Sequence, residues 1–142
     1  MEVSEVRKRV YEAIERAKRS AAERRALVDE AEAEYQLFLD RVAVPLFRQI
    51  VSILRAEKRL FSVFTPGGSV RLMSDRSSDD YIELVLDTTD ARPQVMIHSS
   101  RSRGRRVTRS EIAIGQDGPV RELTEEDVLS VVLKELEPLV ER

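Results

Sequence analysis

Apolar positions in the first 44 residues recur every three or four residues, and this spacing predicts a long α-helix. Residues 2–44 contain neither Gly nor Pro and are rich in Ala, Glu, Arg and Lys, which favour helix. The mean spacing lies between the period of a coiled coil and that of a straight helix. The apolar seam runs through Val3, Val6, Val10, Ala13, Ala17, Ala21, Arg24, Val28, Ala31, Tyr35, Phe38 and Val42.

This predicted helix is too long for a chain of 142 residues to bury by itself. About 43 helical residues would span about 65 Å, so part of the helix must project or pair with something. We expect pairing through the seam positions Val3, Val6, Val10, Ala13, Ala17, Ala21, Val28 and Ala31. The alternative is a single helix that is solvated and held by pairs such as Glu12–Arg16, four residues apart, or that folds against its own chain.

Pro45 interrupts the helical pattern and predicts a kink near residue 44, because its ring clashes with the preceding turn. A second helical segment over residues 45–58 is much richer in large apolar side chains. These are Leu46, Phe47, Ile50, Val51, Ile53 and Leu54, and we expect this segment to pack in the core.

After residue 58 the apolar period changes to two, which predicts an antiparallel meander of four or five strands. The strands are expected over residues 60–64, 69–73, 81–87, 94–99 and 106–114, with a loop at 100–105. Between the first two strands, Pro66 and Gly67 fit the central positions of a type II turn, with Gly67 at positive φ. Along the last strand, the apolar residues change from odd-numbered to even-numbered positions between Val107 and Ile112, which suggests a bulge or a break.

The last segment predicts a capped helix after a turn at residues 115–119. Thr124 is the expected N-cap, with Asp127 completing a capping box. Pro138 is expected to end this helix or to bend its last turn. Its apolar face comprises Val128, Leu129, Val132, Leu133, Leu136 and Val140, and can cover one side of the sheet. The sequence thus predicts an α+β fold, with a helical arm over residues 1–44 and an α+β domain over residues 45–142.

Composition excludes several kinds of site. With no Cys and one His, the chain has no disulfide, thiolate zinc site, Cys nucleophile or multi-His metal site. Its apolar runs are too short to cross a bilayer, and its N-terminus lacks the apolar core of a signal peptide. We therefore expect a cytoplasmic protein with no membrane partner.

Positive charge is concentrated in one place. The net charge is −2, yet residues 92–110 hold six basic residues and no acidic one. The candidate anion-binding or partner-binding residues are Arg92, Arg101, Arg103, Arg105, Arg106 and Arg109. Arginine forks bind phosphate and carboxylate in a bidentate manner, but this stretch has no aromatic residue for base stacking. Contact with another protein and a plain solvated loop are the alternatives.

No catalytic constellation is evident. His98 has no carboxylate beside it in the sequence, and the Gly67–Gly68 pair is not followed by the Lys and helix of a phosphate loop. The acidic residues at 75, 79, 80 and 83 fit a solvated turn better than a metal site. We expect a non-enzymatic interaction module without metal or cofactor, which forms a homodimer or larger assembly through its N-terminal helix. The alternative function is binding of an anionic ligand or nucleic acid by the loop from Arg101 to Arg109, and nucleic acid is the less favoured partner.

Overall fold

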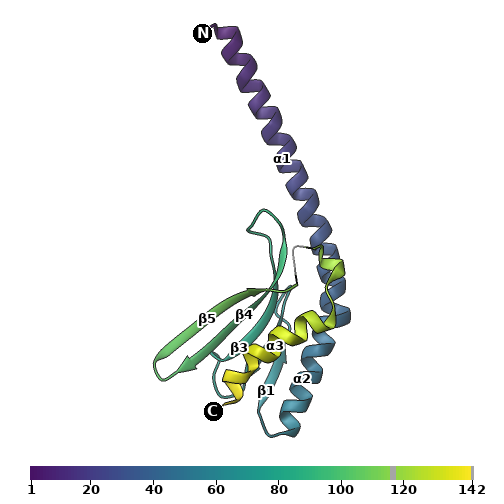
Figure 1. The fold of residues 1–142 in the computed structure, drawn as a ribbon, viewed down its shortest axis with the longest axis vertical. Helices are drawn as coiled ribbons and strands as arrows, with labels where there is room; N and C mark the ends of the chain where they lie inside the picture. Colours follow the sequence, from purple (N-terminus) through teal and green to yellow (C-terminus); the bar gives the residue numbers. More distant parts are fainter. Residues whose placement is uncertain (116–117, 142) are drawn as a thin grey trace.

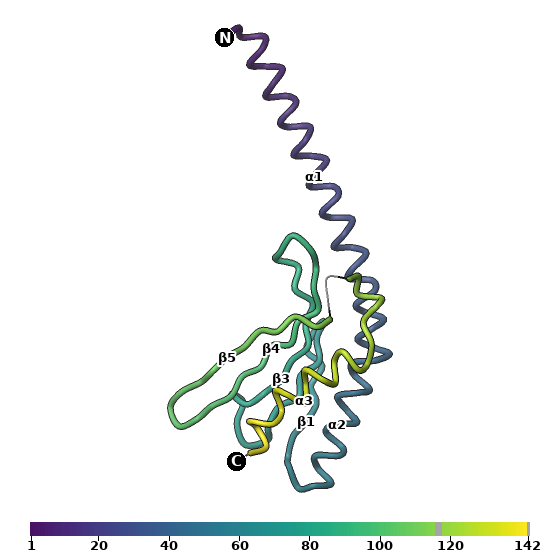
Figure 2. Tube along the Cα trace, in the orientation of Figure 1, coloured from purple at the N-terminus to yellow at the C-terminus, as the bar shows by residue number. Residues whose placement is uncertain are grey.

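The computed structural model describes residues 1–115 and 118–141, and it confirms the predicted α+β order of elements (Figures 1 and 2). A long helix, α1, is followed by a π-helical turn, η1, a second helix, α2, an antiparallel sheet, a short 3₁₀ turn, η2, and helix α3. The helical bounds are α1 Val3–Phe38, η1 Leu39–Ala43, α2 Val44–Ala56, η2 Val120–Glu122 and α3 Glu125–Val140.

The interruption predicted at Pro45 takes the form of the π-helical turn η1. Pro45 occupies the first turn of α2, which continues from η1 without a break, so its missing N–H removes one helical hydrogen bond there. The wider turn before it lets the Val44 N–H reach the carbonyl of Leu39. On α2, Leu46, Phe47, Ile50 and Val51 are buried as predicted, but Ile53 is 59% exposed and does not belong to the core.

The sheet is a five-stranded meander in the order β1-β2-β3-β4-β5, with all neighbours antiparallel. The strands are β1 Phe61–Phe64, β2 Val70–Ser74, β3 Tyr81–Asp87, β4 Gln94–Arg103 and β5 Arg106–Ala113. One face of the sheet is buried beneath α2 and α3, and its side chains Leu72, Ile82 and Ile97 are fully enclosed. The opposite face is half-buried.

Three local predictions in the sheet are wrong. In the first hairpin, the Ser69 N–H donates to the Pro66 carbonyl over 3.0 Å, and Gly68 rather than Gly67 has positive φ. The predicted bulge is absent, because the β4–β5 register runs unbroken from Arg103–Arg106 to Met96–Ala113. The predicted loop at residues 100–105 is strand up to Arg103, followed by a two-residue turn.

Helix α3 has the predicted capping box. The Thr124 hydroxyl accepts from the Asp127 N–H, and the Asp127 carboxylate accepts from the Thr124 N–H. The helix continues through Pro138, and Leu133, predicted on its apolar face, is 45% exposed. Residues 116 and 117 of the predicted turn lie outside the described residues.

Candidate functional site

The first part of α1, residues 3–27, projects from the rest of the molecule (Figure 1). Every residue from 3 to 27, here called the helical arm, is exposed. The exposed side chains include large apolar ones, and Val3, Val10 and Tyr11 are each more than half accessible. Two ion pairs of the arm, Glu5–Arg9 and Glu15–Lys18, link neighbouring turns of the same helix. The arm therefore presents an apolar seam to solvent.

The positions predicted for self-association divide into three groups. Val3, Val6, Val10, Ala13, Ala17 and Ala21 are exposed on the arm. Val28 is half-buried, and Ala31 is only 8% exposed because it packs on the body of the protein. Ala31 is thus not accessible to a partner helix. The prediction also omitted Ile14, which is 43% exposed one residue beyond Ala13.

Tyr35 fixes the base of α1 to the sheet. Its hydroxyl donates to the carbonyl oxygen of Gly68 over 2.7 Å and lies 3.3 Å from that of Leu84. Burial raises the pKa of Tyr35, and the negative charge of Glu83 raises it further. The hydroxyl therefore stays protonated and remains a donor at physiological pH.

A second projection is the end of the β4–β5 hairpin. Strand β3 begins at Tyr81 opposite Ser100, so from residue 101 onward β4 pairs with β5 alone. Residues 101–108, here called the arginine ribbon, form a two-stranded ribbon beyond the sheet (Figure 2). Its base is fixed by Asp80, which is 4% exposed and accepts from the Ser102 N–H over 2.7 Å. This acid, predicted in a solvated turn, is a structural anchor.

The structure brings some of the predicted arginines together and separates others. Arg103 lies directly opposite Arg106 in the register, and Arg101 shares their face of the ribbon. Arg105 lies in the turn, and Arg109 projects from the opposite face.

Five of the predicted arginines are Arg101, Arg103, Arg105, Arg106 and Arg109. Among the residues that the structure describes, their side chains form no hydrogen bond or ion pair. Arg92 precedes β4 and lies at the other end of this ten-residue strand, about 30 Å away. It does not belong to the same cluster.

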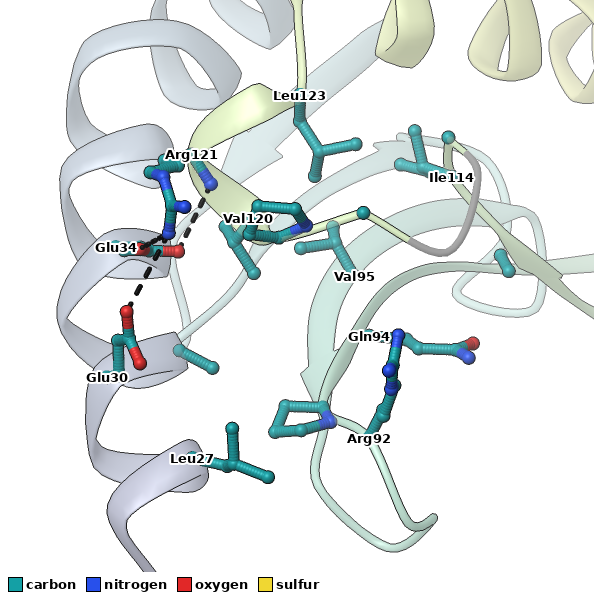
Figure 3. A pocket seen from close by; sticks show the side chains of 16 residues that line it. Leu27, Glu30, Glu34, Arg92, Gln94, Val95, Ile114, Val120, Arg121 and Leu123 are labelled. Atoms are coloured by element: carbon teal, nitrogen blue, oxygen red, sulfur yellow. Dashed lines mark hydrogen bonds and ion pairs between the residues drawn. The ribbon is translucent and has the colours of Figure 1, made fainter.

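A cleft of about 330 Å³ lies where α1 passes the start of β4 (Figure 3). Its lining is mainly apolar, with Leu27, Val95 and Val120 among the contributors. At its rim, Arg121 bonds to Glu34 over 3.0 Å and lies 3.7 Å from Glu30. The hydrogen bond with Glu34 and its negative charge raise the pKa of Arg121. These contacts link η2 to α1 and steady the base of the arm.

The structure places a carboxylate near His98, the one histidine of the chain. His98 Nε2 lies 3.9 Å from a carboxylate oxygen of Glu111 on the half-buried face of the sheet. Among residues 1–115 and 118–141, no three His, Asp or Glu side chains are placed to hold a metal ion. None of the helices described is long and apolar enough to span a membrane. No protein-family model, curated protein or solved structure matches this chain significantly.

Proposed function

We propose that this protein is a non-enzymatic assembly module that self-associates through its helical arm. The observation that carries the proposal is the apolar seam on a helix outside the body, with Val3, Val6 and Val10 all exposed. Isolated helices are marginal in water, and most of their stability in proteins comes from packing an apolar face. A partner helix would supply that packing, and the alanines at positions 13, 17 and 21 allow close approach.

A second copy of the chain is the partner that the charge pattern favours. Residues 1–27 hold eight basic and five acidic side chains, whereas residues 28–40 hold five acidic and no basic ones. In an antiparallel arrangement, the basic side chains of each arm would approach the exposed acidic side chains at the base of the other α1, such as Asp29 and Glu32, which flank the seam positions that the body covers. Opposite charges beside an apolar seam support pairing and orientation in helical assemblies.

Light scattering coupled to size-exclusion chromatography tests this proposal on the full chain. We expect a mass above the 16.3 kDa of one chain at tens of micromolar. The variant Val6→Asp/Val10→Asp introduces two charges into the seam and should lower the mass. Ser4→Asp/Ala26→Asp adds the same charge on the opposite side of the arm and should leave the mass unchanged. A wild-type monomer, or equal effects of both variants, would contradict the proposal.

The arginine ribbon supports a second candidate function, binding of an anionic polymer. Arg103 opposite Arg106 is a repulsive cross-strand pair, and such pairs are destabilising unless an anion lies between or beside them. A two-stranded ribbon also fits the width of a DNA major groove. Since the ribbon lacks aromatic residues, phosphate contacts to a duplex are favoured over stacking on single strands.

Binding to a fluorescent duplex at several salt concentrations tests this second function. Arg103→Glu/Arg106→Glu should weaken binding and lower the slope of log K against log salt by about two. Arg48→Glu/Arg76→Glu makes the same charge change at exposed positions outside the arm and the ribbon, and should leave that slope unchanged. Equal binding by wild type and the ribbon variant would contradict it.

A further inference from the structure

Strand β5 is a long edge strand that lacks Pro, Lys and bulges, and its charged residues are Arg106, Arg109 and Glu111. It has eight residues, no Pro, no Lys and an unbroken register with β4. It forms the outer edge of the sheet (Figure 1). The other edge strand, β1, has four residues and is followed closely by Pro66. Long, regular edges readily pair with another strand, and natural proteins usually block them with Pro, Lys or bulges.

The outward hydrogen-bonding groups of β5 can be assigned from the ladder. The Ile114 N–H donates to the carbonyl of Val95 over 3.0 Å, so at position 114 the backbone is directed toward β4. Hydrogen-bonded and non-hydrogen-bonded pairs alternate along an antiparallel ladder. The N–H and C=O groups of Val107, Arg109, Glu111 and Ala113 therefore point away from β4, along the free edge of the sheet.

Charge complementarity selects one way of pairing this edge with itself. A two-fold axis at Ser110 places Arg109 opposite Glu111 of the second copy, and the symmetry forms this pair twice. The same register places Val107 opposite Ala113, so apolar residues flank the charged pairs. An axis at Arg109 or at Glu111 would instead place like charges opposite each other. Only the Ser110 axis brings opposite charges together while matching outward backbone groups.

We propose that β5 pairs antiparallel with β5 of a second copy about a two-fold axis at Ser110, joining two sheets into one of ten strands. Arg109 and Glu111 are both exposed, and Glu111 has 69% of its side chain accessible. This surface is separate from the helical arm, so one chain contacts two different copies. Two isologous contacts per chain build a closed tetramer or an open chain of subunits, according to whether the symmetry closes.

Charge exchange in the full chain tests this edge pairing. Arg109→Glu places two like-charged pairs in the interface and should weaken association about tenfold. Glu111→Arg should do the same, and the double exchange Arg109→Glu/Glu111→Arg should restore association. Arg101→Glu alters the same hairpin outside the interface and should have no effect. Failure of the double exchange to restore association, with circular dichroism showing a folded protein, would overturn the proposal.

Combining these changes with the arm variant separates the two surfaces. In the Val6→Asp/Val10→Asp background, we expect a dimer held by β5, and Arg109→Glu should reduce it to a monomer. If the arm variant alone is already a monomer, the edge pairing is wrong while the arm proposal stands. If the arm variant retains the wild-type mass and Arg109→Glu lowers it, the arm proposal is wrong while the edge pairing stands.

Discussion

The Tyr35 hydroxyl donates to the carbonyl oxygen of Gly68 over 2.7 Å, and this bond ties the long helix to the first hairpin. Tyr35 is 4% exposed, so Tyr35→Phe would leave the Gly68 carbonyl without this donor. We expect a loss of about 1–2 kcal/mol in the free energy of unfolding, measured by urea denaturation. Tyr11→Phe, on the exposed arm, is the control and should change nothing. Equal stability of the two variants would show that the bond contributes nothing.

The division between core and surface on α2 can be tested with two isoleucines. Ile50 is 7% exposed, whereas Ile53 is 59% exposed on the same helix. Ile50→Asp would bury an unpaired charge and should abolish the cooperative unfolding transition. Ile53→Asp should change the free energy of unfolding by about 0.5 kcal/mol or less. Thermal unfolding followed by circular dichroism distinguishes the two, and a reversed order would contradict the assigned core.

Strands were predictable from the sequence where one face is buried. In β3, Ile82 and Leu84 are enclosed while Tyr81 and Glu83 are half-buried, so the alternation marks both the strand and its orientation. The ribbon carries no such signal, because residues 103–108 are exposed on both faces. Its charged residues are typical of a loop. The change of apolar positions at Val107 marks the point beyond which neither face of the strand is buried, rather than a bulge.

The extent of the arm was harder to predict, because the seam continues with the same spacing through exposed and buried turns. Ala21 is exposed and Ala31 is buried, although both are seam alanines. The difference is that the rest of the protein packs beside Ala31, and the spacing of apolar residues along the helix carries no information about that contact. For the same reason, the sequence grouped Arg92 with the ribbon arginines, although most of β4 lies between Arg92 and Arg101.

The repulsion between Arg103 and Arg106 predicts a substitution that stabilises the protein. Arg103→Glu would convert a like-charged cross-strand pair into an opposite-charged one. We expect a gain of about 0.2–1 kcal/mol in the free energy of unfolding at low salt, and a smaller gain in 1 M salt. Arg105→Glu, in the turn with no directly opposite residue, is the matched control. A destabilised Arg103→Glu protein would mean that the two side chains do not repel.

The corrected first turn gives a contrast between two adjacent glycines. Gly68 has φ +78°, which strains any residue with a Cβ, whereas Gly67 has no heavy atom near an added Cβ and no positive φ. Gly68→Ala should lower the free energy of unfolding by about 1 kcal/mol. Gly67→Ala should leave it unchanged or raise it slightly, since the unfolded chain loses freedom. If chemical denaturation instead shows that Gly67→Ala is the more destabilising of the two, the turn predicted from the sequence would be supported.

Asp87 at the end of β3 should titrate below an ordinary aspartate. The Thr89 hydroxyl donates to its carboxylate over 2.6 Å and the Thr89 N–H over 2.8 Å, and these bonds lower the pKa of Asp87. Because the folded pKa is lowered, the bonds stabilise the protein above the pKa of the unfolded chain. That contribution is lost as the pH falls through the lowered folded pKa.

Carboxyl carbon shifts in an NMR titration from pH 2 to pH 6 measure this value directly. Thr89→Val removes the stronger donor, so the pKa of Asp87 should rise part of the way toward that of an unperturbed aspartate. Thr88→Val, one residue earlier, leaves both bonds in place and should have no effect on it. An Asp87 that titrates at the same pH in wild type and in Thr89→Val would show that the hydroxyl bond does not form in solution.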